Sequence, residues 1–362
     1  MAVSEQAVRA ALAQVIDPDT RRDLVSGKAV RAVRVAGDTI AVDIELGYPA
    51  RSQFDSMQAR VEAALAAAGI AGAQVSVTSR IASHAVQRGV KLIPGVRNII
   101  AVASGKGGVG KSTTAVNLAL ALAAEGANVG MLDADIYGPS IPTMLGVSGR
   151  PESLAQNTME PLVGHGIQAN SIGFIIPSSD SPMVWRGPMV TQALEQLLTQ
   201  TRWRDLDYLV VDLPPGTGDI QLTLSQRVPV TGAVIVTTPQ DIALLDARKG
   251  LRMFQKVNIP ILGLVENMSM HVCSNCGHAE PIFGSGGGQK MATDYEVELL
   301  GQLPLDIRIR EQADAGKPSV VAEPGGAVAA AYRAIARRVA VKIADLDRDM
   351  TSRFPNIVVQ NT

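Results

Sequence analysis

The chain has 362 residues, 33 of them basic and 34 acidic, which gives a formal net charge of −1 at pH 7. This balance argues against a protein that binds nucleic acid or an anionic membrane through its overall charge. With 46% hydrophobic residues and 34 glycines, the composition fits an α/β protein with buried parallel strands, and the length suits two domains.

The absence of a membrane span and of a signal-peptide pattern, together with the cysteine usage, predicts where the protein is located. No apolar run reaches the roughly 18 residues that a membrane-spanning helix needs, and the first 17 residues do not have the layout of a signal peptide. We therefore expect a cytoplasmic protein. Its two cysteines, Cys273 and Cys276, form one C-x-x-C pair. In a reducing compartment such a pair indicates metal or redox chemistry, not a structural disulfide.

Residues 1–85 predict a small α+β domain, because apolar residues recur first at helical and then at alternating spacing. The expected elements are a helix near residues 8–16, strands over 30–35 and 40–46, a helix over 53–68 and a strand over 74–81. Residues 86–97 include Gly89, Pro94 and Gly95 and break both periods. They are expected to form a linker.

The chain changes character at residue 98, where a continuous apolar strand runs into G-K-G-G-V-G-K-S-T. This stretch fits the P-loop pattern G-x-x-x-x-G-K-[ST], whose backbone N–H groups surround phosphate while the next helix adds its dipole. We expect Lys111 to reach the β- and γ-phosphates of ATP and Ser112 to ligate Mg²⁺. The residues expected to bind nucleotide here are Gly105, Lys106, Gly107, Gly108, Val109, Gly110, Lys111, Ser112 and Thr113.

A second lysine, Lys106, lies inside the loop, where a bulky cation is not required for wrapping phosphate. K-G-G-x-G-K-[ST] is the deviant form of the P-loop, and the segment resembles the MinD/Mrp group of dimerising ATPases. The resemblance implies that Lys106 reaches the nucleotide bound by the partner subunit and contributes to catalysis. The alternative is an exposed, solvated lysine.

Carboxylates follow two further apolar strands. One strand ends in Asp133 and Asp135, and another ends in Asp212, within D-L-P-P-G-T-G-D. Ligands bind open α/β sheets at the carboxyl ends of their strands. We expect Asp135 to position or polarise the attacking water, Asp212 to act on Mg²⁺ as a Walker B aspartate, and Gly216 to sense the γ-phosphate. Simple loop capping is the alternative for the first two aspartates.

The rest of this region alternates strands and helices. Strands over 232–237 and 259–265 flank a helix over 242–257, which is the pattern of right-handed βαβ crossovers. The fold expected for residues 98–350 is therefore a P-loop NTPase with a doubly wound, mostly parallel sheet. Residues 351–362 are expected to form a C-terminal tail.

The C-x-x-C pair stands directly after E-N-M-S-M-H-V. Together with the P-loop, D-A-D-I-Y-G-P-S and D-L-P-P-G-T-G-D, the segment E-N-M-S-x(3)-C-x-x-C-G resembles the Mrp/ApbC family of iron–sulfur cluster carriers over roughly residues 90–345. The resemblance implies an ATPase that acts as a switch, with apo iron–sulfur proteins and cluster-assembly scaffolds as partners. It also implies that Asn267 hydrogen-bonds adenine, for which a turn-forming asparagine is the alternative.

The N-terminal domain resembles the small MIP18-type domain that is often fused in front of such ATPases, with V-I-D-P-D at residues 15–19. Free-standing relatives of that domain can carry a cysteine where this chain has L-G-Y-P-A-R, residues 46–51. No cluster ligand is therefore expected from this domain.

Three kinds of site compete for Cys273 and Cys276. A thioredoxin-like pair is disfavoured, because the motif here follows a strand at the nucleotide edge. Structural zinc could use His271 and His278 as well, although the spacing is tighter than in zinc fingers. A [4Fe–4S] cubane needs four protein ligands, and two subunits of a homodimer would supply them as two thiolates each. We favour this last arrangement.

Positioning ATPases with a structural zinc are the alternative class of function. A MinD-like membrane-positioning ATPase would need a basic amphipathic C-terminal helix, but the tail is broken by proline and nearly neutral. A ParA-like DNA-partitioning ATPase would need a basic stripe. One predicted helix carries such a cluster, although a solvated helix face also explains it: Arg333, Arg337, Arg338 and Lys342. We expect neither a nucleic acid nor a membrane as partner.

Overall fold

The computed structural model describes residues 3–37, 39–84, 86, 90–154, 157–175, 187–273 and 275–348. The predicted tail, residues 351–362, lies outside this part of the chain, as do residues 87–89 of the predicted linker. None of the helices in the described part has the length and apolar character required to cross a membrane.

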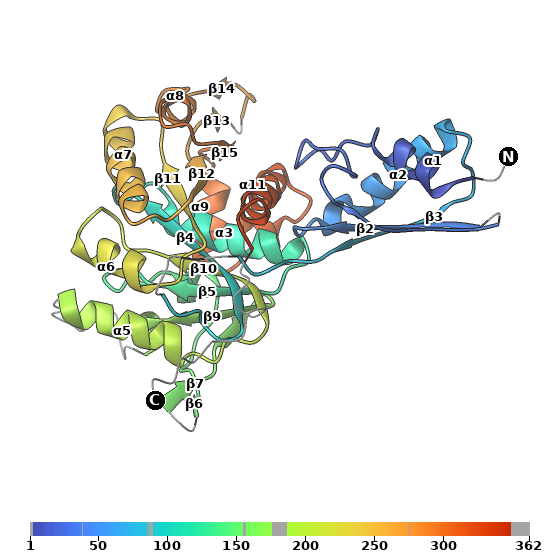
Figure 1. Ribbon diagram of the computed structural model, residues 1–362. Helices are drawn as coiled ribbons and strands as arrows, with labels where there is room; N and C mark the ends of the chain where they lie inside the picture. The colour runs from blue at the N-terminus through green and yellow to red at the C-terminus, as the bar shows by residue number, and fades with distance from the viewer. Residues whose placement is uncertain are drawn as a thin grey trace, which may run out of the picture.

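The N-terminal unit packs two helices against a three-stranded sheet of order β1-β2-β3 (Figure 1). β1 and β2 pair antiparallel, whereas β2 and β3 pair parallel because α2 provides the crossover between them. Alternate residues of β2 are buried, so one face of this sheet covers the core. The elements are α1 (Glu5–Leu12), β1 (Val30–Ala36), β2 (Thr39–Leu46), the 3₁₀ turn η1 (Arg51–Gln53), α2 (Phe54–Ala67) and β3 (Gln74–Ser79).

The first helix ends earlier than its apolar spacing predicts. α1 begins after Ser4, whose hydroxyl accepts a hydrogen bond from the Ala7 N–H, and it ends at Leu12. Val15 is still buried, but Ile16 is exposed. The apolar pattern therefore continues into a turn that packs on the same core, and helical spacing alone did not mark where the helix ends.

The rest of the chain forms an eight-stranded sheet of order β15-β12-β11-β4-β10-β5-β9-β8. Each neighbouring pair is parallel except β8 and β9, which confirms the predicted doubly wound, mostly parallel sheet. The strands are β4 (Val96–Ser104), β5 (Val129–Asp133), β8 (Leu162–Gly164), β9 (Ile167–Ser171), β10 (Leu206–Asp212), β11 (Gly232–Thr237), β12 (Ile261–Glu266) and β15 (Leu299–Gln302).

Two hydrophobic cores lie on the two faces of this sheet, because alternate residues of the central strands point in opposite directions. Ile100 and Val102 of β4 belong to one core, and Ile99 and Ala101 belong to the other. The first face is covered by α3 (Lys111–Ala124), α10 (Ser319–Ala322) and α11 (Ala327–Ala344), the second by α5 (Gly187–Gln200), α6 (Asp219–Arg227), α7 (Asp241–Lys256) and α8 (Gly287–Asp294).

Short elements complete the domain. They are α4 (Ile141–Met144), β6 (Ser153–Leu154), β7 (Thr158–Met159), the 3₁₀ turn η3 (Ile172–Phe174), β13 (His271–Val272), β14 (Ala279–Glu280) and α9 (Ile307–Asp314). β13 and β14 form a two-stranded antiparallel hairpin (Figure 1), and a bridge between His271 and Leu305 ties it to the segment after β15.

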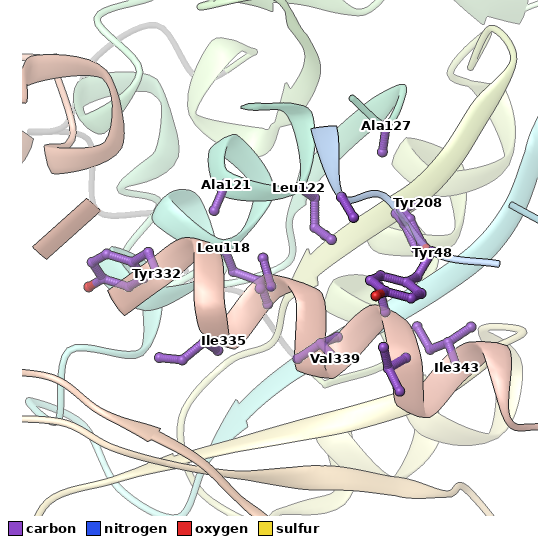
Figure 2. Close-up of a cluster of buried hydrophobic side chains, with 14 of the residues drawn as sticks. Tyr48, Leu118, Ala121, Leu122, Ala127, Tyr208, Tyr332, Ile335, Val339 and Ile343 are labelled. Carbon is purple, nitrogen blue, oxygen red and sulfur yellow. The ribbon is translucent and has the colours of Figure 1, made fainter. Parts of the chain in front are cut away.

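The N-terminal unit stands on the side of the sheet that α3 and α11 cover (Figure 1). Its buried residues belong to the same hydrophobic cluster as those of α3 and α11. Figure 2 shows Tyr48 of the N-terminal unit toward the Ile343 end of α11, in the cluster that includes Leu118 and Leu122 of α3. β4 begins at Val96, so the structured strand starts before the predicted linker ends.

Replacing Leu118 by alanine tests the packing of α3 against α11. Leu118 is fully buried, so Leu118→Ala should lower the free energy of unfolding by about 2–5 kcal/mol. Leu245→Ala is the matched control, because Leu245 lies on α7 with 54% of its surface exposed and should cost no more than about 0.5 kcal/mol. Chemical denaturation measures both values, and equal losses would contradict the assignment of α3 to the core.

Candidate functional site

The P-loop connects the end of β4 to the first residue of α3. The local geometry explains why several of its positions require glycine. Gly108 and Gly110 both have φ of +80°, in the left-handed region that favours glycine. At Gly105 the constraint is space, since a Cβ atom would overlap the backbone of Asp246 and Ala247 in α7. The loop is thus held closely between α3 and α7, at the carboxyl end of a central strand.

Lys111 brings the predicted P-loop and Walker B elements together. Its Nζ atom donates to Oδ1 of Asp212 at 2.6 Å and lies 3.7 Å from Oδ2 of Asp135. It also lies 3.2 Å from the hydroxyl of Ser112. Only 6% of the lysine side chain is exposed. One buried cation therefore meets both predicted acidic residues and the predicted Mg²⁺ ligand on α3.

Asp212 has the properties expected of a metal-directing carboxylate. It is fully buried at the end of β10, and burial raises its pKa, an effect that the charge of Lys111 partly offsets. Its Oδ2 atom has no hydrogen-bond partner in the described part of the chain. A hard cation such as Mg²⁺ prefers oxygen ligands, so the Asp212 carboxylate, which also interacts with the Ser112 hydroxyl, fits Mg²⁺.

Asp133 acts as a brace for the loop that carries Asp135. Asp133 and Asp212 lie side by side in register on β5 and β10. The carboxylate of Asp133 accepts hydrogen bonds of 3.0–3.2 Å from the backbone N–H groups of Asp135, Ser140 and Ile141 and from the hydroxyl of Ser171. Burial, reinforced by the nearby charge of Asp212, raises the pKa of Asp133 to about 7.

Asp135 is more open than the two buried aspartates. Its side chain is 13% exposed, and it faces the ammonium group of Lys111. Burial raises its pKa, and Lys111 counteracts part of that rise. Solvent can therefore reach Asp135 beside the P-loop lysine, whereas Asp133 and Asp212 are fully buried.

Two predicted residues lie on the loops that face this edge. Gly216 has φ of +99°, and its N–H donates to the carbonyl of Ser104 at 3.0 Å, which joins the loop after β10 to the end of β4. Lys106 is half-buried. Among the described residues none forms an ion pair with Lys106, in contrast to Lys111.

Asn267 contacts the P-loop directly. It follows β12, and its side-chain N–H donates to the carbonyl of Val109 at 2.9 Å. A Cβ atom at Gly110 would overlap the amide of Asn267, so the glycine permits this close approach. The structure therefore places the predicted adenine-binding residue against the phosphate-binding loop, and adenine contact stays a prediction.

Cys273 and Cys276 lie in the turn between β13 and β14. The Cys273 N–H donates to the carbonyl of His278 at 2.9 Å, and the Gly277 N–H donates to the carbonyl of Cys273 at 2.9 Å, with Gly277 at φ of +73°. Cys273 is half-buried and Cys276 is exposed. The Cys276 thiol is thus exposed, and the Cys273 thiol is partly accessible.

The two flanking histidines do not complete a metal site within the chain. His271 is held by the carbonyl of Leu305, which lies 3.1 Å from its Nδ1 atom. Across the described residues, no group of three or more histidine, cysteine, aspartate or glutamate side chains could hold a metal ion. This finding counts against a Cys₂His₂ zinc site in one subunit.

The basic cluster on α11 is engaged inside the molecule. Arg337 pairs with Asp19 and Glu125, and Lys342 lies 2.8 Å from a carboxylate oxygen of Glu298. Arg333 and Arg338 donate to the backbone carbonyls of Pro324 and Leu300. These contacts weaken the hypothesis that the cluster is a DNA-binding stripe.

Sequence patterns missed two residues that shape the site. Ser171 supplies the only side-chain hydroxyl on Asp133 among the described contacts, although it ends a strand far along the chain. The backbone of α7 at Asp246 fixes the position of Gly105. Neither role could have been found from a motif, because both depend on which elements meet at the sheet edge.

The fold and this edge together define a P-loop NTPase. Residues 95–340 match the family model described as NUBPL iron-transfer P-loop NTPase, and residues 5–78 match the model of an iron–sulfur cluster assembly protein. A solved nucleotide-binding protein of Archaeoglobus fulgidus in complex with ADP is 36% identical, with a TM-score of 0.56, over 64% of this chain and 90% of that one.

Relatives that match most of the chain are more similar still. The iron–sulfur cluster carrier protein of Escherichia coli K12 is 53% identical over 350 residues, which cover 94% of each chain. The iron–sulfur cluster transfer protein NUBPL of Mus musculus is 53% identical over 273 residues, covering 74% of this chain and 85% of that one. The chain belongs to the family of iron–sulfur cluster carrier P-loop NTPases, which confirms the resemblance inferred from its motifs.

Paired glycine substitutions test the packing of the P-loop. Gly105→Ala should lower the melting temperature by several degrees, because its methyl group would overlap the α7 backbone. Gly107→Ala is the control, since a Cβ atom there meets no atom within 4 Å. Differential scanning calorimetry without nucleotide compares the two, and a destabilised Gly107→Ala with an unaffected Gly105→Ala would contradict the geometry.

Proposed function

We propose that this chain is an ATP-dependent iron–sulfur cluster carrier, whose homodimer holds a [4Fe–4S] cluster and transfers it to apo-proteins. One observation carries the proposal: the turn at Cys273 and Cys276 presents two thiols, and no third ligand joins them among the described residues. The names of the relatives, which are carriers and a transfer protein of iron–sulfur clusters, support it.

The number of cysteines in the chain is the reason for proposing a dimer. A cubane cluster is usually held by four cysteine thiolates, and this chain has two cysteines. A two-fold axis through the cluster doubles each donor without any further residue. Exposed apolar side chains occur next to the turn, at Val272 (53%) and Ile282 (51%), and a subunit interface would bury them.

A short covalent path connects the nucleotide edge to the thiols. Asn267 donates to the P-loop at Val109 and lies six positions before Cys273 in the chain. Between them, the Ser269 N–H donates to the carbonyl of Leu303, and the Leu305 N–H donates to the carbonyl of Met270. A change in the P-loop can therefore move the cysteine turn through a segment that is tied to the sheet.

The residues of the edge have distinct tasks in hydrolysis. Lys111 stabilises charge on the transferring phosphoryl group, and Asp135 orients the attacking water. Ser112 and Asp212 would hold Mg²⁺, which when bound neutralises charge on the phosphates. Gly216 lets its loop respond to the γ-phosphate, and Lys106 reaches the nucleotide of the partner subunit. Hydrolysis then serves as a switch between cluster binding and release.

We place this activity in the cytoplasm, as the sequence predicts, because a C-x-x-C pair stays reduced in that compartment and is then available to bind a cluster. The partners that the function requires are a second copy of the chain, cluster-assembly scaffolds that load it and apo-proteins that receive the cluster.

The two lysines of the loop make a matched pair for testing catalysis. Lys111→Ala should abolish ATP hydrolysis, because it removes the charge directed at the phosphates. Lys106→Ala should keep most of the nucleotide affinity and lose turnover, because its target lies in the partner subunit. Phosphate release and nucleotide binding measure the two effects, and a mixture of the variants should recover activity through heterodimers.

Folding is controlled separately in this experiment. Lys111→Ala leaves the buried Asp212 without its partner and should also destabilise the chain. Lys111→Arg keeps a cation beside Asp212 but not the compact ammonium group, so it should fold and remain inactive. Near-normal turnover by a folded Lys111 variant would remove the assignment of the site.

Substituting the cysteines tests whether they bind the iron–sulfur cluster. Cys273→Ser or Cys276→Ser should eliminate the cluster after anaerobic reconstitution, whereas ATP binding should persist because the thiols lie outside the P-loop. Iron and sulfide are determined per chain together with the molecular mass, and four of each per dimer is the expected result. A stable monomer that holds one zinc ion would refute the carrier and favour the positioning ATPase with a structural zinc.

A further inference from the structure

Glu125 lies at the far end of the helix that begins with the P-loop lysine. α3 starts at Lys111, and Glu125 follows its last residue, Ala124. With a rise of about 1.5 Å per residue, the helix is about 21 Å long. Ten of its residues are buried, so it fits its surroundings closely along its length. The position of one end of α3 therefore constrains the other.

Residues of η1 in the N-terminal unit form hydrogen bonds to this end of α3. The Arg51 N–H donates to the backbone carbonyl of Glu125 at 3.0 Å. Ser52 donates twice to the Glu125 carboxylate, from its N–H at 3.0 Å and from its hydroxyl at 2.7 Å. The carbonyls at a helix C-terminus lack partners within the helix, so η1 serves as a cap supplied by another domain.

An arginine of α11 also binds the Glu125 carboxylate. Arg337 donates to the Glu125 carboxylate at 2.8 Å and to Asp19 of the N-terminal unit at 3.0 Å. The Glu125 side chain is fully buried, and it lies at the negative end of the α3 dipole. A buried carboxylate in that position is unfavourable unless donors surround it. Arg337 of α11 is one of those donors, with Arg333 of α11 at 3.9 Å, and Ser52 is the donor that the N-terminal unit supplies, so the docked unit completes the set of donors around Glu125.

We propose that the N-terminal unit is part of the nucleotide-binding machinery, because Ser52 and Glu125 fix the position of the P-loop helix. Both are positioning residues that act through α3, and neither lies at the nucleotide edge. Docking of the unit and binding of nucleotide then favour each other. The inference rests on nucleotide binding in the function proposed above and is independent of the cluster.

The direction of this linkage follows from the helix. Loss of the η1 contacts leaves the last turn of α3 without its cap and the Glu125 carboxylate short of donors. Helical order is cooperative, so a loosened last turn weakens the order of the first turn. The first turn presents the N–H groups that bind phosphate. Because binding linkage is reciprocal, bound nucleotide must in turn strengthen docking by the same factor.

Ser52→Ala in the full-length chain tests the proposal, since it removes one hydroxyl and keeps the backbone. We expect the Kd for ADP, measured by isothermal titration calorimetry, to rise about 5-fold or more. Ser52→Thr keeps the hydroxyl and should restore binding. Ser76→Ala is the matched control, because it removes a 2.8 Å hydrogen bond to Asp43 at an exposed position of the same unit, and should leave the Kd unchanged.

Amide hydrogen exchange gives the reciprocal measurement. ADP should slow exchange of the Arg51 and Ser52 amides in the wild type by a factor similar to the change in Kd, and this slowing should shrink in Ser52→Ala. A purely structural role for Ser52 would lower the melting temperature without changing either value. Unchanged ADP affinity in Ser52→Ala beside normal wild-type binding would overturn this inference alone. Failure of the wild type to bind ADP would overturn the nucleotide function as well.

Discussion

The buried pair of Lys111 and Asp212 is the contact on which the arrangement of the site depends. It joins the first residue of α3 to the last residue of β10, across 101 positions of sequence, at 2.6 Å. Two unlike charges without solvent are stable only at close range and in fixed geometry. The pair therefore fixes how the P-loop helix meets the sheet. Asp133, in register with Asp212, then fixes the loop that carries Asp135.

Sequence patterns predicted the fold well, because its signals are local. A continuous apolar strand, the nine-residue motif G-K-G-G-V-G-K-S-T and a helix form one recognisable unit, and D-L-P-P-G-T-G-D at the end of β10 is equally local. Parallel topology then requires that strand ends converge at one edge. That constraint explains why Lys111, Asp135 and Asp212 could be grouped before any coordinates were known. The ends of single elements were less predictable, as the early end of α1 at Leu12 shows.

Contacts between distant segments were beyond sequence reasoning. The sequence predicts an adenine contact for Asn267 but does not predict that its amide donates to the Val109 carbonyl, a contact that depends on the φ of Gly110 and on where β12 lies in the sheet. The basic residues of α11 resemble an exposed stripe, but two of them pair with carboxylates of distant segments: Arg337 with Asp19 of the N-terminal unit and Lys342 with Glu298 before β15. A helix pattern identifies a polar face without identifying what covers it.

The cysteine turn has a consequence for how the protein responds to its own abundance. In the proposed homodimer each chain supplies two of the four thiols, so occupancy of the shared site would follow mass action and rise with the square of chain concentration when dimers are scarce. Dilution alone would then release cargo, with no change in the chemistry of the thiols. A cell that doubles its supply of this chain would gain up to four times as many complete sites.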